Sequence, residues 1–260
     1  MAKLRFCDSH CHLDFAEFTA DRKEIVARAL AAGVEAIIVP GVARQAAADV
    51  WLQQCQGVTI YRGVGLHPYF IAQHQSADLA WVEQQLQQHP AWVIGEVGLD
   101  KTCANYPEQQ QLFIGQLELA VQYQRPLLIH HRQSQADLLK LIKPLASQLP
   151  AQPGILHAFS GSLQQAEQWL ALGFKLGVGG VISYPRAQKT RATVAALPLD
   201  SLVLETDAPS MPLQGFQGQR NEPAQIARVL VELQGLRNES VAELAAATWD
   251  NSMAIVANLG

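Results

Sequence analysis

Short apolar segments alternate with longer amphipathic segments along the whole chain, and this alternation limits the fold more than any other feature. The short segments are rich in β-branched residues, which is typical of strands, whereas the longer ones carry apolar residues at helical spacing. Strands are expected at Leu4–Asp8, Ala36–Val39, Thr59–Val64, Trp92–Glu96, Leu127–His130, Gly154–His157, Phe174–Gly177 and Leu202–Glu205. Helices are expected at Asp21–Ala32, Ala43–Cys55, Leu79–His89, Pro107–Tyr123, Gln135–Gln148, Ser162–Ala171, Lys189–Leu197, Pro223–Gln234 and Ser240–Ala257.

This alternation predicts an α/β fold with parallel strands covered by helices, and eight strands are the number that closes a (β/α)8 barrel of the TIM type. A doubly wound open sheet alternates in the same way, but the number of strands favours the barrel. No linker, low-complexity run or change in composition divides the 260 residues, so we expect one domain over residues 1–260.

The charge and the apolar segments indicate which partners to expect. The formal net charge is -4 and no long basic run occurs, so a protein that holds nucleic acid mainly by neutralising phosphates is not expected. An enzyme that cleaves nucleic acid stays open, because bound metal ions supply positive charge locally. The chain shows no signal-type segment and no apolar run long enough to span a bilayer. We therefore expect a cytoplasmic location, free cysteine thiols, no membrane association and no obligate protein partner.

Two histidines follow the first expected strand, two residues apart. In an extended strand Asp8, His10 and His12 share one face, because successive side chains alternate between faces. Two imidazoles on one face can form half of a metal site. The alternative is a pair of polar residues at a strand end that are satisfied by water.

Further residues of metal-binding types follow the other strands. The carboxyl ends of barrel strands meet at one rim, where the active sites of such barrels lie. The residues expected at this rim are His10, His12, His67, Glu96, His130, His157, Glu205 and Asp207. Histidines and carboxylates suit divalent ions such as zinc or manganese, and so many ligands exceed what one ion needs. We therefore expect two ions, which share a carboxylate when about 3.5–4 Å apart. His74 and His89 lie away from the strand ends and are expected to face solvent.

The two acids at the end of the last strand take different roles. Asp207 lies at the strand tip and is assigned metal binding and proton acceptance, whereas Glu205 lies one step deeper. Glu205 is placed to accept a hydrogen bond from a ligand imidazole. Asp8 takes the analogous deeper position below His10.

Seven motifs in order along nearly the whole chain resemble the TatD family of metal-dependent hydrolases and deoxyribonucleases. They are Asp8-Ser9-His10-Cys11-His12-Leu13-Asp14, Gly65-Leu66-His67-Pro68, Ile94-Gly95-Glu96-Val97-Gly98-Leu99-Asp100, Pro126-Leu127-Leu128-Ile129-His130, His157-Ala158-Phe159-Ser160-Gly161, Glu205-Thr206-Asp207-Ala208-Pro209 and Arg220-Asn221-Glu222-Pro223. Within the family, the segments 175–180, 184–187 and 215–219 resemble the YjjV-like branch.

The resemblance implies a barrel of the metallo-dependent hydrolase kind with two divalent ions. It places His10, His12 and Asp207 on one ion and His130 and His157 on the other, with Glu96 bridging the two.

The chain departs from the family pattern at three positions. Lys101 stands where an aromatic residue is usual, His131 where a small residue is usual, and Ala158 where relatives often have cysteine. None of these removes a ligand, so the departures leave the substrate open rather than the metal chemistry.

Several rim residues have both a functional and a structural interpretation. His67 and Arg132 are candidates for binding substrate phosphate. The structural alternative for His67 is a histidine that packs a loop, and for Arg132 it is a surface arginine paired with a helix acid. Tyr184 and Arg186 follow the seventh strand, where barrels often bind phosphate. The alternative is that they belong to a loop without a role in binding. Arg220 and Glu222 are expected to form an ion pair with each other.

The leading hypothesis is a TatD-type deoxyribonuclease that cleaves phosphodiester bonds of DNA ends by metal-activated water, with Asp207 as proton acceptor and Glu96 between the metals. A binuclear hydrolase of a small ester, amide or lactone is the alternative, and a metal-storing protein without catalysis is the third. Histidine-rich ligation favours zinc, while magnesium or manganese also suit nucleases of this type.

Overall fold

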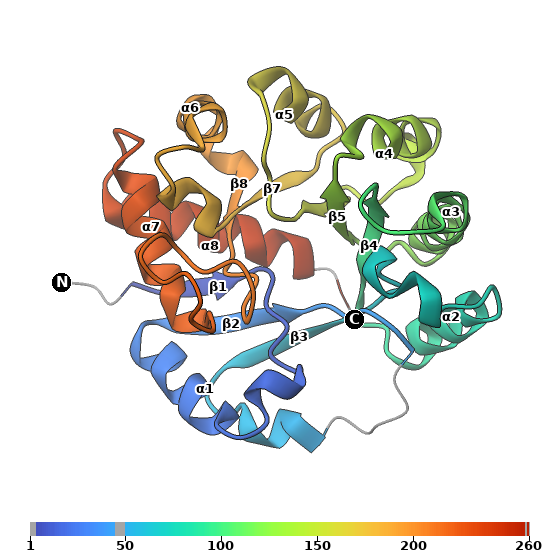
Figure 1. Cartoon of the computed structure of the whole chain (residues 1–260), viewed down its shortest axis with the longest axis horizontal. Helices are drawn as coiled ribbons and strands as arrows, with labels where there is room; N and C mark the ends of the chain where they lie inside the picture. The colour runs from blue at the N-terminus through green and yellow to red at the C-terminus, as the bar shows by residue number, and fades with distance from the viewer. Residues whose placement is uncertain (1–3, 45–49, 258, 260) are drawn as a thin grey trace.

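The computed structural model describes residues 4–44, 50–257 and 259. Its eight strands are all parallel and lie in the order of the sequence, as Figure 1 shows. They are β1 (Phe6–Asp8), β2 (Val34–Val39), β3 (Thr59–Val64), β4 (Val93–Asp100), β5 (Leu127–Arg132), β6 (Gly154–Leu156), β7 (Lys175–Val178) and β8 (Leu202–Leu204). The N–H of Ser9 donates to the carbonyl of Leu204 at 2.9 Å, which joins the first and last strands. The predicted (β/α)8 barrel is confirmed.

Helices surround the barrel on all sides in Figure 1. The α-helices are α1 (Arg22–Ala31), α2 (Asp78–Gln88), α3 (Tyr106–Tyr123), α4 (Gln135–Ile142), α5 (Leu163–Leu170), α6 (Gln188–Ala196), α7 (Ile226–Gln234) and α8 (Val241–Val256). Short 3-10 helices are η1 (Ala16–Phe18), η2 (Val50–Gln54), η3 (Pro68–Gln73), η4 (Lys143–Gln148), η5 (Gly180–Ser183), η6 (Leu199–Ser201) and η7 (Pro223–Gln225).

Two predicted helices differ from the observed ones. Residues 45–49 of the helix expected at Ala43–Cys55 lie outside the described residues, and Val50–Gln54 forms the 3-10 helix η2. The helix expected at Gln135–Gln148 ends at Ile142 and continues as η4. Pro144 explains the change, because proline has no N–H for the helical hydrogen bond.

Strand β4 continues to Asp100, four residues beyond its predicted end at Glu96. It pairs with β5 along this extension, with Gly98 opposite His130. Gly98 has φ +158°, and a Cβ there would lie 2.0 Å from the His130 carbonyl oxygen. Only glycine allows this close approach of the two strands, so the extension is built around a residue at the site.

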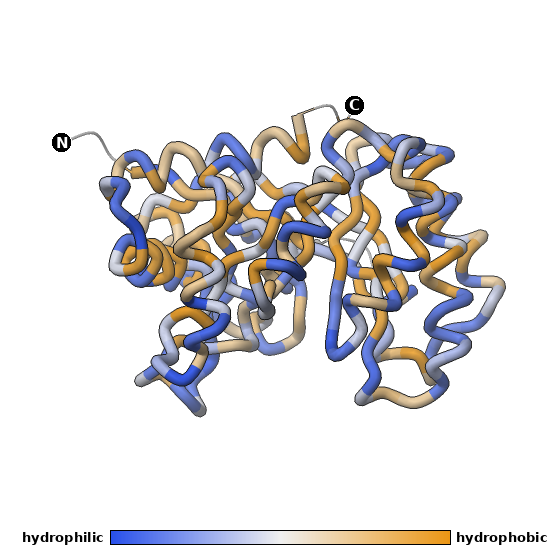
Figure 2. Tube along the Cα trace, turned by 90° about the horizontal axis from the view of Figure 1, so that it is seen from above, coloured by the Kyte–Doolittle hydropathy of each residue, from blue (hydrophilic) through white to orange (hydrophobic). Residues whose placement is uncertain are grey.

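A separate apolar cluster fills the barrel interior below the rim. The strands contribute buried side chains to it, and these pack against the end of α8. The strand members are Cys7, Ala36, Ile38, Val93, Leu128, Ile155 and Val203. On β5, Leu128 and His130 share the interior face because side chains two residues apart point the same way. His157 and Glu205 directly follow the ends of β6 and β8. Figure 2 shows the apolar residues concentrated within the body of the molecule and hydrophilic residues toward its outer turns.

The four cysteines are free, as expected, and Cys7, Cys11 and Cys55 are buried. No helix within the described ranges has both the length and the apolar character that crossing a membrane requires.

Candidate metal centre

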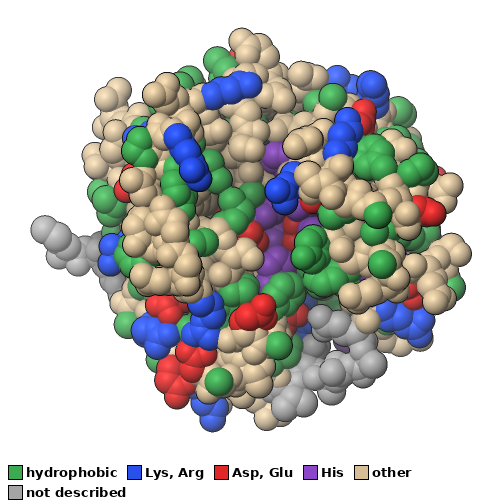
Figure 3. Space-filling view, in the orientation of Figure 1, with side chains coloured by type: hydrophobic (Ala, Val, Ile, Leu, Met, Phe, Trp, Pro, Cys, Tyr) green, Lys and Arg blue, Asp and Glu red, His purple; other side chains and the backbone are tan. Residues whose placement is uncertain are grey.

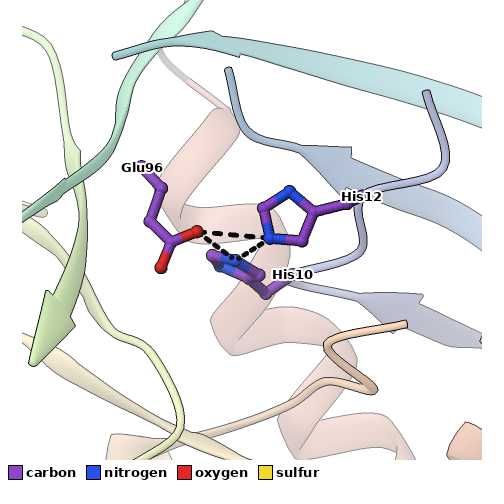
Figure 4. A group of neighbouring side chains, drawn as sticks. All are labelled: His10, His12 and Glu96. Carbon is purple, nitrogen blue, oxygen red and sulfur yellow. Dashed lines mark hydrogen bonds and ion pairs between the residues drawn. The ribbon is translucent and has the colours of Figure 1, made fainter. Parts of the chain in front are cut away.

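His10 and His12 lie on the segment that follows β1 rather than on the strand itself, because β1 ends at Asp8. Their Nε2 atoms are nevertheless 3.3 Å apart. Both nitrogens face Glu96 Oε2, at 3.1 and 3.2 Å, as Figure 4 shows. The predicted convergence of the two imidazoles is therefore present, although a turn of the chain produces it rather than strand alternation.

Glu96 is buried and lies between two pairs of histidines. Its Oε2 faces His10 and His12, and its Oε1 lies 3.0 Å from His67 Nε2 and 3.1 Å from His130 Nδ1. Burial acts to raise the pKa of Glu96, but the surrounding imidazoles outweigh it and hold the pKa well below its ordinary value. Glu96 is therefore a carboxylate that presents one oxygen to each half of the site.

Asp207 and His157 complete the same cluster from the other side. Asp207 Oδ1 lies 3.8, 3.6 and 3.7 Å from the Nε2 atoms of His10, His12 and His157. The rings of His10 and His157 stack with centroids 3.7 Å apart. The backbone N–H of Asp207 donates to the His10 carbonyl at 2.9 Å, which ties the two rim segments together.

Glu205 supports His157, as the sequence predicted for it. Glu205 Oε1 lies 3.0 Å from His157 Nδ1 and accepts the N–H of Ala158 at 2.6 Å. Burial lowers the pKa of His157, but Glu205 and Asp207 outweigh it and raise that pKa to about 10. Gly177 provides the room for this carboxylate, because a Cβ there would lie 2.1 Å from Glu205 Oε2.

Asp100 is a functional residue that the sequence reasoning missed. Its Oδ2 lies 3.2 Å from His130 Nε2, on the ring edge away from Glu96, and its Oδ1 accepts the N–H and the hydroxyl of Thr102. Burial acts to raise the pKa of Asp100, but these partners lower it. Its position four residues beyond Glu96 was the available signal, since even spacing along a strand keeps the same face.

Asp8 does not contact an imidazole, so its predicted analogy with Glu205 is wrong. It accepts hydrogen bonds from the N–H of His10 (3.3 Å) and from the N–H and hydroxyl of Thr206 (2.9 and 2.5 Å). Burial raises the pKa of Asp8 to about 8. Its role is to hold the backbone of the segments that carry His10 and Asp207.

His67 is a hydrogen-bond donor to the cluster. The N–H of Tyr69 donates to His67 Nδ1 at 2.9 Å, so the ring proton sits on Nε2 and points to Glu96 Oε1. Burial lowers the pKa of His67 to about 4, which keeps the ring neutral. The prediction that His74 faces solvent is wrong, because its Nε2 is 2.9 Å from the His67 carbonyl oxygen and the side chain is half-buried. His89 is exposed as predicted.

Arg132 and Lys101 lie side by side where β4 and β5 end, joined by a hydrogen bond from the Lys101 N–H to the Arg132 carbonyl. Lys101 Nζ is 2.8 Å from Asp137 Oδ2, which also accepts the Tyr106 hydroxyl at 2.9 Å. Arg132 is exposed, and no acidic partner for its guanidinium is found among the described residues. Figure 3 shows histidines at the bottom of the central hollow and lysine or arginine side chains around its mouth.

The predicted ion pair between Arg220 and Glu222 is wrong. Arg220 instead binds Asp21, with Nη2 to Oδ2 at 2.5 Å, and Glu222 binds Arg28 at 2.7 Å. Arg28 lies on α1, and Asp21 is the N-cap residue of the same helix. The two pairs therefore tie the segment after β8 to α1, a contact that only the closed barrel creates.

The cluster has the donor chemistry of a divalent metal site. Among the described residues, three groups of side chains have ligand atoms within 4.8 Å of one another, and all combine imidazole nitrogen with carboxylate oxygen. The groups are His10, His12 and Glu96; His10, His157 and Glu205; and His67, Glu96 and His130. Neutral His67 already uses both ring nitrogens, on the Tyr69 N–H and Glu96, so it fits the role of a neighbour better than that of a ligand.

Comparison with known proteins agrees with this geometry. The family model described as TatD related DNase matches residues 7–256. The uncharacterized metal-dependent hydrolase YjjV of Escherichia coli K12 is 45% identical, over 95% of this chain and 96% of that protein. The 3'-5' ssDNA/RNA exonuclease TatD of Erwinia amylovora is 32% identical, over 95% of this chain and 98% of that protein. The crystal structure of Escherichia coli YjjV superposes with a TM-score of 0.91 at 43% identity, covering 98% of both chains. The chain belongs to the TatD family of metal-dependent hydrolases, in its YjjV-like branch.

Proposed function

We propose that this hydrolase cleaves phosphodiester bonds at the ends of single-stranded DNA. The observation that carries the proposal is the Glu96 carboxylate, which offers one oxygen to each of two histidine pairs. Its exonuclease-named relative from Erwinia amylovora supports the choice of substrate.

Two divalent ions would be held by six side chains. We assign His10, His12 and Asp207 to one ion, His130 and His157 to the other, and Glu96 to both. The spacing supports this division for four of the histidine and aspartate ligands, since Asp207 lies on the side of His10 and His12 while His130 meets the opposite oxygen of Glu96. The assignment of His157 follows the family resemblance, because its Nε2 lies 3.7 Å from Asp207 Oδ1 and its ring stacks on His10. When bound, such ions activate water and neutralise charge that develops on the phosphate.

The remaining rim residues act on the substrate and on the proton. The guanidinium of Arg132 is suited to donate to phosphate oxygens, because no acid is paired with it among the described residues. The Nε2–H of His67 points to Glu96 Oε1 in this structure, and it would donate to a phosphate oxygen once metal engages that carboxylate. Asp207 accepts the proton of the attacking water, since its carboxylate is the more exposed of the two acids on the segment after β8. Glu205 and Asp100 orient His157 and His130.

Zinc is the favoured metal, because the ligand set is rich in imidazole, while magnesium and manganese remain compatible with the carboxylates. We expect the protein to act in the cytoplasm. These two assignments are tested separately, by elemental analysis of protein purified without added metal and by localisation of a tagged chain.

A small ester, amide or lactone is the second candidate substrate. Two observations favour it: the net charge of -4, and the ion pair that commits Lys101 to Asp137 instead of to a phosphate chain. A nucleic acid strand that lies along the rim would bind more tightly if cations such as Lys101 were free to contact its phosphates.

The two candidates are separated by one set of assays. Metal-free protein is reloaded with zinc, manganese or magnesium and assayed on single-stranded DNA and on a panel of small esters and lactones. We expect end-directed cleavage of DNA in at least one metal form. Turnover of a small ester with no cleavage of DNA in any form would replace the proposed substrate with the second candidate.

A further inference from the structure

A cavity of about 260 Å³ lies beside the metal centre, between the segments that follow β7 and β8. Val181, Tyr184, Arg186 and Ala187 line one side and Met211 the other. Its walls are mostly apolar, which is unusual for a surface that only has to bind phosphate. The fold thus offers space for a flat apolar group at this point of the rim.

The cavity shares lining residues with a small hollow at the catalytic cluster. Val181 and Met211 also line a smaller hollow whose other walls include Glu205 and Asp207. A substrate whose phosphate lies at Asp207 therefore has its adjoining group directed toward the cavity. These shared residues place the cavity next to the catalytic cluster.

Tyr184 and Arg186 form a stacked pair at the cavity wall. The Tyr184 hydroxyl donates to the Pro212 carbonyl at 2.7 Å, which fixes the ring and joins the two rim segments. The Arg186 guanidinium carbon lies 5.1 Å from the centroid of the Tyr184 ring. Arg186 is exposed, and no ion pair with an acid is found for it in the described part of the chain. A planar cation backed by an aromatic ring presents a surface on which another ring can stack.

We propose that this cavity is a nucleobase subsite, which takes the base of a nucleotide next to the scissile phosphate. The proposal rests on the proposed nuclease function and names the part of the nucleotide that the site recognises. Bases of single strands stack on aromatic rings and on arginine planes, and such stacking tolerates any base because each has a π-face. The apolar walls accept the ring, and the sugar and phosphate of the same nucleotide extend toward Asp207.

The test compares single-stranded oligonucleotides that differ by one base. One substrate has normal bases, and the others have an abasic site at the last or at the penultimate nucleotide of the end from which cleavage proceeds. We expect the metal-loaded wild type to lose roughly five- to a hundred-fold in kcat/KM on one of the abasic substrates. The loss should appear mainly in KM, because stacking holds the ground state and the transition state alike.

Two variants locate the effect in the cavity. Arg186→Ala removes the stacking plane, and Ala187→Phe fills the space; each should lower kcat/KM on the normal substrate and leave the abasic substrate unchanged. Lys189→Ala is the matched control, because it removes an exposed cation from α6 without touching the cavity. It should retain the full preference of the wild type for the normal base.

The outcomes separate the two proposals. Equal cleavage of normal and abasic substrates by the wild type overturns the subsite and leaves the nuclease function standing. If both Arg186→Ala and Ala187→Phe still prefer the normal substrate over the abasic one, the base binds elsewhere, and the subsite is also overturned. Absence of cleavage of every oligonucleotide, with turnover of small esters, overturns the nuclease function and the subsite with it.

Discussion

His67 differs from the other histidines of the site in the use of its ring nitrogens. Because the Tyr69 N–H occupies Nδ1, the ring proton lies on Nε2, where it is donated to Glu96 Oε1, and no lone pair remains for a metal. His67→Phe should therefore keep the bound metal and lower kcat on single-stranded DNA by roughly 10²-fold, the effect of losing one well-placed donor.

Elemental analysis and steady-state kinetics on the same preparations check this prediction. His89→Phe is the control, since His89 is exposed and far from the strand ends. Loss of metal in His67→Phe, in proportion to the loss of activity, would contradict the donor role and make His67 a ligand.

Asp100 acts on His130 from the ring edge opposite Glu96. Removing its charge weakens the hold on the imidazole, so Asp100→Asn should lower metal affinity by roughly 10–100-fold. Competition of the protein with a chromophoric chelator measures this affinity. Asp250→Asn, an exposed acid on α8, should leave it unchanged, and equal affinity in the two variants would show that Asp100 is only structural.

At the scale of residues, the site was predictable where one strand end supplies one functional side chain. His130 and His157 were predicted to end their strands and His10 and His12 to follow the first strand, and their convergence needed only the barrel. Partners chosen by packing across the barrel were not predictable. The acids that bind Arg220 and Lys101, Asp21 and Asp137, lie far away in the sequence and depend on distances that no local pattern contains.

At the scale of elements, the segment after β8 depends on its attachment to α1. Arg220 binds Asp21 and Glu222 binds Arg28. The four side chains are all partly exposed, so each pair is expected to stabilise the fold by about 0–1 kcal/mol. Arg220→Met should thus lower the free energy of unfolding by no more than about 1 kcal/mol.

The same attachment has a defined pH dependence. The hydrogen bond from Arg220 lowers the pKa of Asp21 below its ordinary value. The stability that the pair contributes is therefore present above the unfolded pKa of Asp21 and is lost as the pH falls through the folded one. The free energies of unfolding of the wild type and of Arg220→Met, measured in urea, should differ at neutral pH and become equal in acid. A difference that grows as the pH falls would contradict the pairing.

The boundaries of helices and strands agreed with the local sequence patterns except near a proline and a glycine that change what the backbone can do. Pro144 ends α4 early, and Gly98 lets β4 run beside β5 beyond the predicted end. A prolonged strand with glycines has the same sequence pattern as a strand followed by a loop, so the extension of β4 was not predicted, and the even spacing of Asp100 from Glu96 was the one signal for it. The alternation itself was sufficient for the barrel, since each of the eight strands lies within four residues of its predicted bounds.

At the scale of the whole molecule, metal binding and folding are coupled. The proposed ligands come from segments before residue 13 and after residue 200 as well as from β4 and β5, so bound metal joins parts of the chain that separate on unfolding. A ligand present at a thousand times its dissociation constant stabilises the folded state by about 4 kcal/mol. For a chain of this size, removing the metal should therefore lower the Tm by roughly 8–16 °C.

Calorimetry of metal-loaded and chelator-treated protein checks this coupling. Restoring the metal should restore the Tm, and Glu96→Gln should show little response to either treatment. An unchanged Tm after verified metal removal would mean that the cluster binds metal too weakly to act as a resident centre.

Glu96 carries the central claim, because it is the side chain that both halves of the cluster share. The most direct measurement is the metal content and single-stranded DNA cleavage of Glu96→Gln, with the exposed Glu118→Gln of α3 as its matched control. Metal ions contribute several kcal/mol to such displacements, so Glu96→Gln should lose bound metal and at least about a thousand-fold in cleavage rate. Glu118→Gln should match the wild type in both. Undiminished cleavage by a Glu96→Gln protein verified to be free of metal would contradict the account.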